Sequence, residues 1–306
     1  MADGPFLDLR HLKMIQAIAK HGRVTDAAEA LGVTSSALSH RIREAERRLD
    51  LVLFTRMHKR LRMTPAAEYL AEMAERVLSE MDRAERDVRR MDRGVEHVVR
   101  IGVEAYSTYH WLPGFNTYLR THLPGVELQV MANVTRDPVR ALTNRHVDII
   151  VTSGDAQPIG THQLPLFTDE LLFIVPPNHP LAGKAYVDGA DIEGEDFITY
   201  TLTPEPDREF ARLFRPSESY PRWAATVELP EAIVELVAAG QGSSVLAGWA
   251  VRPAIRGGRL VGARVGKDGI DIPWQALIRT EDKDQGPILQ VGQALADWAA
   301  QNGGFG

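Results

Sequence analysis

The stretch TSSALSHRIREAERRL, residues 34–49, combines regularly spaced apolar residues with a run of hydroxyl and basic side chains. Its apolar positions recur at the spacing of a single helical face and comprise Leu38, Ile42, Ala45 and Leu49. Because that face must be buried, the helix turns a second set of residues outward near its N-terminus. This second set consists of Ser35, Ser36, Ser39, His40 and Arg43.

Short polar side chains on the first two turns of a helix suit its end-on insertion into the major groove of DNA. There, hydroxyl groups and histidine can reach base edges, while the helix N-terminus and arginine meet phosphates. A solvated amphipathic helix is the alternative interpretation, and the flanking sequence must decide between the two.

Two further helices are predicted before this one. Apolar residues at helical spacing indicate an amphipathic helix over residues 9–20, and a shorter helix follows over residues 26–31. Thr25 is a candidate N-cap of the short helix, and Gly32 stands where a left-handed residue commonly ends a helix. Together with residues 34–49, the short helix forms a helix, a glycine turn and a second helix.

The segment LVLFTRMHKRLRMTP, residues 51–65, predicts a short β-hairpin, or wing, packed on these helices. Its basic residues Arg56, Lys59 and Arg60 are candidates for contacts with phosphates or with the minor groove. A surface that only improves solubility is the alternative. A basic hairpin directly after two helices joined by a tight glycine turn favours binding to double-stranded DNA, with base recognition mostly by residues 34–49.

A long helix is predicted from Pro65 to about residue 93, with Thr64 as its N-cap. Its apolar residues follow the alternating spacing of a heptad pattern. They are Leu70, Ala74, Val77, Met81, Ala84, Val88 and Met91. A helix with so narrow an apolar stripe is best buried against a copy of itself, so we expect self-association; packing on its own chain is the alternative.

The charge of the chain is distributed unevenly. The 306 residues carry a net charge of −6, yet residues 1–65 hold 12 Lys and Arg against 7 Asp and Glu, and the remainder holds 23 against 34. A basic N-terminal part and an acidic body indicate two or three domains, of which the first meets nucleic acid.

The sequence contains no cysteine, no pattern of a secretory signal and no apolar run long enough to span a bilayer. We therefore expect a cytoplasmic protein without disulfides, thiolate metal sites or membrane contact.

Beyond residue 98, short strand-like runs alternate with helical patterns, which predicts an α/β domain on a parallel sheet with both faces covered. Open α/β sheets bind ligands outside the carboxyl ends of their strands, where hydroxyl groups and helix starts can hold a carboxylate or another polar small molecule. Hydroxyl-bearing residues follow four of the predicted strands, and ordinary helix caps are the alternative for some of them. The candidates are Tyr106, Ser107, Thr108, Thr135, Thr152, Ser153, Thr199, Tyr200 and Thr201.

No motif in the body predicts catalysis. The GQGSSV segment lacks the last glycine of a dinucleotide fingerprint, and LAGKAYV lacks the pattern of a phosphate-binding loop. Neither GxSxG nor HExxH occurs, and the ten histidines are scattered, so we expect no catalytic residue, no metal site and no cofactor. An enzyme with a DNA-binding appendage would need an activated nucleophile or an acid–base pair, and an exported solute-binding protein would need a signal sequence.

Residues 9–70, from LRHLKMIQAIAKHG to TPAAEYL, resemble the winged helix-turn-helix of LysR-type transcriptional regulators, and the resemblance covers nearly the whole chain. It implies a winged helix-turn-helix domain, a dimerising linker helix and a two-lobed effector domain like that of periplasmic binding proteins. These parts would comprise residues 1–64, residues 65–93, a first lobe of residues 94–163 and 268–306, and a second lobe of residues 164–267. Family members bind operator DNA, take a small inducer between the lobes, often form tetramers and act on RNA polymerase.

The recognition helix departs from the family pattern at its start. Many members have Gln followed by Pro, Ala or Ser there, whereas this chain has Ser35 and Ser36. The resemblance implies base contacts by Ser36, Ser39 and His40, and a serine at position 35 reaches less far than a glutamine. We therefore expect the operator to differ at the corresponding base pair.

Within the family, four segments of the body resemble the regulators of methionine biosynthesis: IGVEAYSTYHWLP, VTRDP, DIIVTS and NHPLA. This resemblance implies homocysteine as the effector and genes of methionine synthesis as targets. A regulator of another pathway that responds to a different small carboxylate is the alternative.

Overall fold

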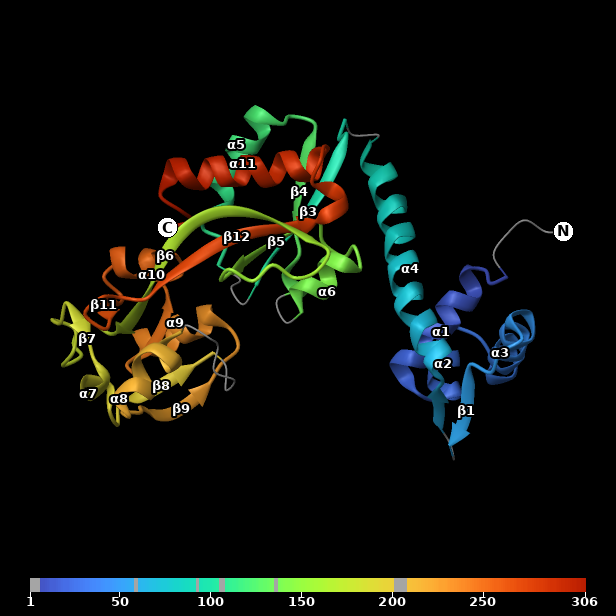
Figure 1. The fold of residues 1–306 in the computed structure, drawn as a ribbon, viewed down its shortest axis with the longest axis horizontal. Coiled ribbons are helices and arrows are strands. Elements are labelled where there is room, and N and C mark those ends of the chain that lie inside the picture. The colour runs from blue at the N-terminus through green and yellow to red at the C-terminus, as the bar shows by residue number, and fades with distance from the viewer. Residues whose placement is uncertain (1–5, 58–59, 92–93, 105–107, 135–136, 201–207) are drawn as a thin grey trace. The chain divides into compact units, whose positions relative to one another are not determined.

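The computed structural model describes residues 6–57, 60–91, 94–104, 108–134, 137–200 and 208–306 (Figure 1). The chain forms two compact units. We call the first the head; it comprises Met1–Arg93 and Asn144–His146. The second, the body, comprises Gly94–Thr143 and Val147–Gly306. No helix in the described ranges is long and apolar enough to cross a membrane.

The head contains the predicted helix-turn-helix, wing and long helix. Its elements are α1 (Leu9–His21), α2 (Val24–Ala30), α3 (Ser35–Leu49), β1 (Phe54–Met57), β2 (Arg60–Met63) and α4 (Pro65–Met91). The strands β1 and β2 pair antiparallel, as a hairpin requires. Thr34 caps α3, since its hydroxyl accepts a hydrogen bond from the Ala37 amide at 3.1 Å. Gly22 and Gly32 have φ values of 69° and 63°, which suit glycine at the ends of α1 and α2.

One predicted cap is wrong. The helix α2 begins at Val24, so Thr25 lies inside its first turn and the capping position falls on Arg23, whose side chain makes no capping hydrogen bond. The Thr25 hydroxyl donates instead to Asp26 Oδ1 at 2.7 Å. A local hydrogen bond between neighbouring side chains thus takes the place of the expected cap.

The apolar stripe of α4 is buried only in its first turns. Leu70 belongs to the hydrophobic core of the head, and Ala74 is fully buried. Farther along, the side chains of Val77, Met81 and Val88 are 41%, 44% and 64% exposed. The alternative of packing on its own chain therefore holds for the first turns of the stripe, while its later described positions remain open to another partner.

The body is built on an eight-stranded mixed sheet. Along the main path, the strand order is β4 (Val126–Val130), β3 (His97–Val103), β5 (Ile149–Ser153), β12 (Asp271–Arg279), β6 (Thr161–Val175), β11 (Val261–Val265) and β7 (Tyr186–Val187). The eighth strand, β10 (Ser244–Ala247), also pairs with β6. A separate pair of parallel strands consists of β8 (Asp196–Thr199) and β9 (Arg222–Thr226). The predicted α/β class is confirmed, but the sheet is parallel only in part, because β12 and β6 run against their neighbours.

Helices cover these strands and complete two lobes. We call the part around β3, β4 and β5 lobe I; its helices are α5 (Leu112–His122), α6 (Pro138–Thr143) and α11 (Pro287–Asn302), with the short turns η1 (Ala132–Val134) and η3 (Thr280–Asp282). We call the part around β7 to β11 lobe II; its helices are α7 (Gly189–Ile192), α8 (Arg215–Ser217), α9 (Pro230–Ala238) and α10 (Gly248–Arg256), with the π-helical turn η2 (Phe210–Phe214).

The strands β6 and β12 join the lobes, and Figure 1 shows them side by side through the body. From Thr161 to Glu170, β6 pairs with β12. From Leu171 to Val175, the same strand pairs with β10 and β11 of lobe II. The strand β6 is 15 residues long and begins at Thr161, so it includes the polar, proline-containing run THQLPLFT as well as the apolar LLFIV.

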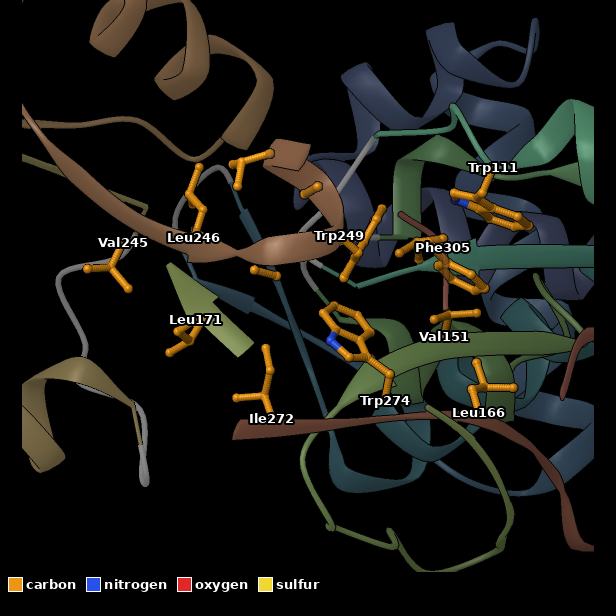
Figure 2. Close-up of a cluster of buried hydrophobic side chains, with 14 of the residues drawn as sticks. Trp111, Val151, Leu166, Leu171, Val245, Leu246, Trp249, Ile272, Trp274 and Phe305 are labelled. Carbon is orange, nitrogen blue, oxygen red and sulfur yellow. The ribbon is translucent and has the colours of Figure 1, made fainter. Parts of the chain in front are cut away.

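Aromatic side chains pack where the two long strands pass between the lobes (Figure 2). Trp111, just before α5, stacks on Phe305 with ring centroids 4.4 Å apart. The Trp249 ring of α10 makes T-shaped contacts with the rings of Trp274 and Phe305, at centroid distances of 5.4 and 5.5 Å. These rings come from both lobes and from the chain after α11, so the apolar core is continuous across the joint.

A buried carboxylate ties β6 to lobe II at this joint. Asp169 accepts hydrogen bonds from the Trp249 amide at 2.8 Å and from Arg252 Nη2 at 2.9 Å. Gly248 permits this approach, because a Cβ there would lie 2.9 Å from the Glu170 carbonyl oxygen. Burial raises the pKa of Asp169 above its ordinary value, although the Trp249 amide and Arg252 act in the opposite direction.

We expect Asp169 to make the stability of the body depend on pH. Because its pKa is raised in the folded state, its contribution to the free energy of unfolding is greatest below the ordinary carboxyl pKa and is lost as the pH rises through the raised value. Asp169→Asn removes this titration and keeps an acceptor oxygen. The free energy of unfolding of the natural chain minus that of the variant should therefore increase on acidification.

Tryptophan fluorescence during denaturant unfolding measures this difference, since all five tryptophans lie in the body. A difference that stays constant between neutral pH and pH values below the ordinary carboxyl pKa would contradict the prediction.

Candidate functional site

The exposed face of α3 is the first candidate surface. Leu38 and Ala45 are fully buried and Ile42 is 8% exposed, so α3 is fixed to the head by one side. The other side carries the five predicted contact residues. Ser35, Ser36, His40 and Arg43 are exposed, and Ser39 is half-buried. The structure therefore brings these polar groups together on one accessible surface beside the N-terminus of a capped helix.

The wing lies next in the chain and supplies basic residues. Arg60 is exposed in β2. Arg56 belongs to β1, but its side chain and the whole of Lys59 lie outside the described residues. The Leu61 amide donates to the Gly22 carbonyl oxygen at 3.0 Å, which attaches β2 to the turn after α1.

Arginines at the C-terminal end of α3 are partly engaged within the head. Arg48 pairs with Glu44 at 2.5 Å and also donates to the Phe6 carbonyl oxygen at 3.1 Å. The hydrogen bond from Arg48 holds the pKa of Glu44 below its ordinary value, so this carboxylate stays charged. Arg43, nearer the N-terminus, is also exposed and is a candidate cation for a phosphate.

The ends of the strands β3 and β5 form the second candidate site. These strands are parallel neighbours, so their carboxyl ends meet at one edge of the sheet. Glu104 directly follows β3, and its amide donates to the Val151 carbonyl oxygen at 2.8 Å. The hydroxyl of Thr152, a residue that is 8% exposed, donates to the Glu104 carboxylate. One predicted hydroxyl group is thus held by an acidic side chain.

Two other predicted hydroxyl groups reach across to lobe II. The Thr108 hydroxyl donates to Glu231 Oε1 in the first turn of α9, at 2.6 Å. The Ser153 hydroxyl accepts from Nη2 of Arg208, also at 2.6 Å. Polar groups of both lobes therefore converge at the carboxyl ends of β3 and β5, where the fold rule for open α/β sheets places a ligand.

Two buried polar atoms near these strands have hydrogen-bonding capacity to spare. The Tyr109 hydroxyl is buried with no hydrogen-bond partner among the described residues. Burial, and secondarily the charge of Glu231, raises the pKa of Tyr109, so the phenol remains a neutral donor. Gln275 is 2% exposed, and its Nε2 donates to the carbonyl oxygens of Gly154 and Ala156 at 2.8 and 3.0 Å.

The amide oxygen of Gln275 is buried and accepts no hydrogen bond from the part of the chain that the structure describes. Gln275 is the register partner of Thr152, so the two side chains share one face of the sheet. Among the described residues, the Tyr109 hydroxyl is thus a donor, and the Gln275 oxygen an acceptor, whose hydrogen-bonding capacity is unused.

The remaining predicted residues fall into two groups. Thr199 is buried at the end of β8, where its carbonyl oxygen accepts from the Val227 amide at 2.9 Å, and Tyr200 packs against the core of the body. The other four, Tyr106, Ser107, Thr135 and Thr201, lie outside the described residues. No group of three or more His, Asp or Glu in the described ranges is arranged to hold a metal ion.

Sequence reasoning missed the charged and amide groups of this site. Glu104 directly follows β3, and Arg208 lies just before η2. Glu231 follows the proline that starts α9, and Gln275 interrupts the apolar run IPWQALI. Gln275 could have been identified from the sequence. A buried amide side chain is stable only when it makes hydrogen bonds, so a glutamine inside an apolar strand indicates nearby polar partners. The pairings of Glu231 and Arg208 depend on contacts between residues more than fifty positions apart and have no local signal.

Comparison with known proteins gives two family matches. Residues 92–300 match the profile "LysR substrate binding domain", and residues 9–68 match "Bacterial regulatory helix-turn-helix protein, lysR family". The transcriptional regulator MetR of Haemophilus influenzae is 33% identical over 91% of this chain and 90% of its own length. MetR of Escherichia coli K12 is 30% identical over 93% of this chain and 88% of its own.

Solved structures show the same architecture. The regulatory domain of MetR from N. meningitidis is 31% identical with a TM-score of 0.54, covering 67% of this chain and 94% of that domain. Full-length CbnR, solved in complex with its target DNA, is 23% identical with a TM-score of 0.68, covering 95% of this chain and 99% of CbnR. At its lower identity the likeness to CbnR supports the fold. The proteins named in these matches are transcriptional regulators rather than enzymes.

Proposed function

This chain belongs to the LysR family of bacterial transcriptional regulators, and we propose that α3 reads its operator while an effector held between lobes I and II controls it. The observation that carries the proposal is the division of α3 into a buried apolar face and an accessible face of hydroxyl groups, histidine and arginine. Ser36, Ser39 and His40 would contact base edges, and Ser35 and Arg43 would lie at the groove margin.

The wing would add affinity for DNA without distinguishing one base sequence from another. Arg60 is exposed on it, and Arg56 and Lys59 belong to the same basic hairpin. Each cation that neutralises a phosphate releases counterions, so binding through the wing weakens as salt rises. Bacterial chromosomal DNA lies in the cytoplasm, so we place an operator-binding regulator there. We also propose RNA polymerase as a partner.

The effector site lies between a first lobe of residues 94–163 and 268–306 and a second lobe of residues 164–267. Homocysteine fits the polar groups gathered there. Its carboxylate can pair with Arg208, and its ammonium group can donate to Glu104, Glu231 or the free amide oxygen of Gln275. The likeness to the MetR proteins supports the same effector and target genes of methionine or sulfur amino-acid metabolism.

Self-association follows from α4. The exposed positions Val77, Met81 and Val88 continue the heptad seam beyond the head core, and a second α4 would bury them. Two such dimers would give the tetramer typical of the family. Effector binding would then shift the population of lobe arrangements, and with it the placement of the DNA-binding heads.

The readout role of α3 predicts different effects for two classes of substitution. His40→Ala or Ser39→Ala should reduce discrimination between operator and random DNA by about 1–3 kcal/mol for each direct base contact. Lys59→Ala should weaken binding to all DNA alike and reduce the salt dependence. Fluorescence anisotropy with both DNAs over a series of salt concentrations separates the two. Equal losses on operator and random DNA for His40→Ala would remove His40 from the readout set.

The effector proposal predicts that homocysteine raises the melting temperature of the protein and changes its operator affinity or footprint. Arg208→Ala and Thr108→Val should abolish the thermal shift. Thr117→Val is a matched control, because Thr117 is exposed and, among the described residues, its hydroxyl donates to the Pro113 carbonyl oxygen within α5. A thermal shift produced by other small carboxylates but not by homocysteine would assign the protein to another pathway, and a shift retained in both variants would place the ligand elsewhere.

The seam on α4 predicts that Val88→Glu weakens dimerisation, since it buries a charge in an apolar interface. Arg89→Glu introduces the same side chain one position farther along, off the seam, and should leave assembly unchanged. Sedimentation velocity at micromolar concentration measures the result. Unchanged assembly in Val88→Glu together with Met81→Glu would show that α4 is not the interface.

A further inference from the structure

One side chain of α3 holds the first strand of the wing. Oε1 of Glu46 accepts hydrogen bonds from the Leu53 amide at 2.9 Å and from the Phe54 amide at 3.1 Å. Leu53 is fully buried and Phe54 is 7% exposed, so these two amides lie where the chain enters β1. Glu46 is seven and eight positions earlier in the sequence, within the same helix that carries the accessible polar face.

The connection that Glu46 holds has few other sources of order. After α3, the chain turns through Asp50 with a φ of 52°, a left-handed conformation that costs free energy in any residue other than glycine. Leu51 and Val52, which follow, are 54% and 61% exposed, so they contribute little apolar burial. Polar contacts, together with the burial of Leu53 and Phe54 that follow, therefore set the direction in which the chain leaves α3.

The opposite side of the same connection is attached to α4. The Thr64 hydroxyl donates toward the carbonyl oxygens of Val52 and Leu53 at 3.0 and 3.1 Å, and the Thr64 amide donates to Leu53 at 2.9 Å. The Glu46 side chain thus attaches this connection to α3, and Thr64, the residue before α4, attaches it to the long helix.

We propose that Glu46 is a positioning residue for DNA binding, which sets the wing at the angle where its cations reach phosphates while α3 occupies the groove. This inference rests on the proposed DNA surface of α3 and the wing. Glu46 acts through the amides of Leu53 and Phe54 and takes no part in base contacts itself. Without the Glu46 contact, the hairpin would tilt about its remaining attachments, the Leu61 amide on the Gly22 carbonyl oxygen and the Thr64 amide on the Leu53 carbonyl oxygen. Such a tilt would move Arg60 relative to the phosphate backbone without unfolding the head.

A double-mutant cycle between Glu46 and Arg60 tests the proposal. In the full-length natural chain, Arg60→Ala should reduce the slope of log K against log salt by about one, as expected for the loss of a phosphate contact. In the Glu46→Ala background, Arg60→Ala should produce no further reduction, because the wing is already displaced. Far-UV circular dichroism and a thermal melt establish that each variant is folded.

Two further variants separate positioning from charge. Glu46→Gln keeps an oxygen that can accept both amide hydrogen bonds, so it should retain the natural salt slope and the full effect of Arg60→Ala. Glu44→Gln removes a carboxylate two positions away whose described partners are Arg48 and His11, and it controls for the effect of lost negative charge on DNA affinity. If Glu46→Ala fails to fold, Glu46→Asp, which withdraws the carboxylate by one methylene, should show a partial loss in the same direction.

The outcomes distinguish this proposal from the function on which it rests. If Arg60→Ala flattens the salt slope equally in the natural and Glu46→Ala backgrounds, the wing contacts DNA without help from Glu46 and the positioning role is wrong. If Glu46→Gln behaves like Glu46→Ala, the two amide hydrogen bonds are not the cause. If neither Arg60→Ala nor Lys59→Ala changes the slope in the natural chain, the proposed wing contact itself is wrong, and the positioning role is overturned with it.

Discussion

The antiparallel pairing of β6 and β12 is the constraint on which the body depends. It runs from the Asp271–Glu170 pair to the Arg279–Thr161 pair, and beyond its end β6 continues into the sheet of lobe II. Since each strand is a single extended segment, the lobes cannot move apart without bending this ladder. The rings of Trp111, Trp249, Trp274 and Phe305 pack against it, and Asp169 fastens it to α10. Relative motion of the lobes is therefore confined to bending and twisting at the joint.

In the head, the packing of one small core sets the direction in which the polar face of α3 points. The core formed by α1, α2 and α3 fixes one face of α3, and the polar face follows from helical geometry. The helix α4 is also divided: its first apolar positions pack on the head and its later ones do not. One helix can thus belong to the core of its own chain and still present an apolar seam to another, because the two functions use successive heptads.

Residues with local causes were predictable from the sequence. The polar face of α3 and the turn at Gly32 follow from spacing and backbone preference within a few positions. The start of β6 at Thr161 was not, because the run THQLPLFT mixes polar residues with a proline and forms a strand only through its partner β12.

The candidate effector site divides in the same way. Its hydroxyl groups could be found, because they lie at or just after the ends of strands; Thr152 and Ser153 are the last residues of β5 itself. Glu231 and Arg208 could not, because they become part of the site only when lobe II folds back toward Thr108 and Ser153. Thr25 failed as a cap for a different, local reason: α2 begins one residue earlier, at Val24, and the Thr25 hydroxyl donates to the neighbouring Asp26.

The contacts between the lobes determine what an effector must do. The hydroxyl groups of Thr108 and Ser153 are already hydrogen-bonded to Glu231 and Arg208. A ligand that binds these groups therefore replaces one set of hydrogen bonds with another. The net gain from such an exchange is small unless the ligand also satisfies atoms that are unpaired within the described chain, such as the Tyr109 hydroxyl and the Gln275 amide oxygen. Reversing a two-state equilibrium from 1:99 to 99:1 requires about 5.5 kcal/mol of preference for one arrangement. The buried unpaired atoms, rather than the hydroxyl groups first expected to bind the effector, are where that preference can arise.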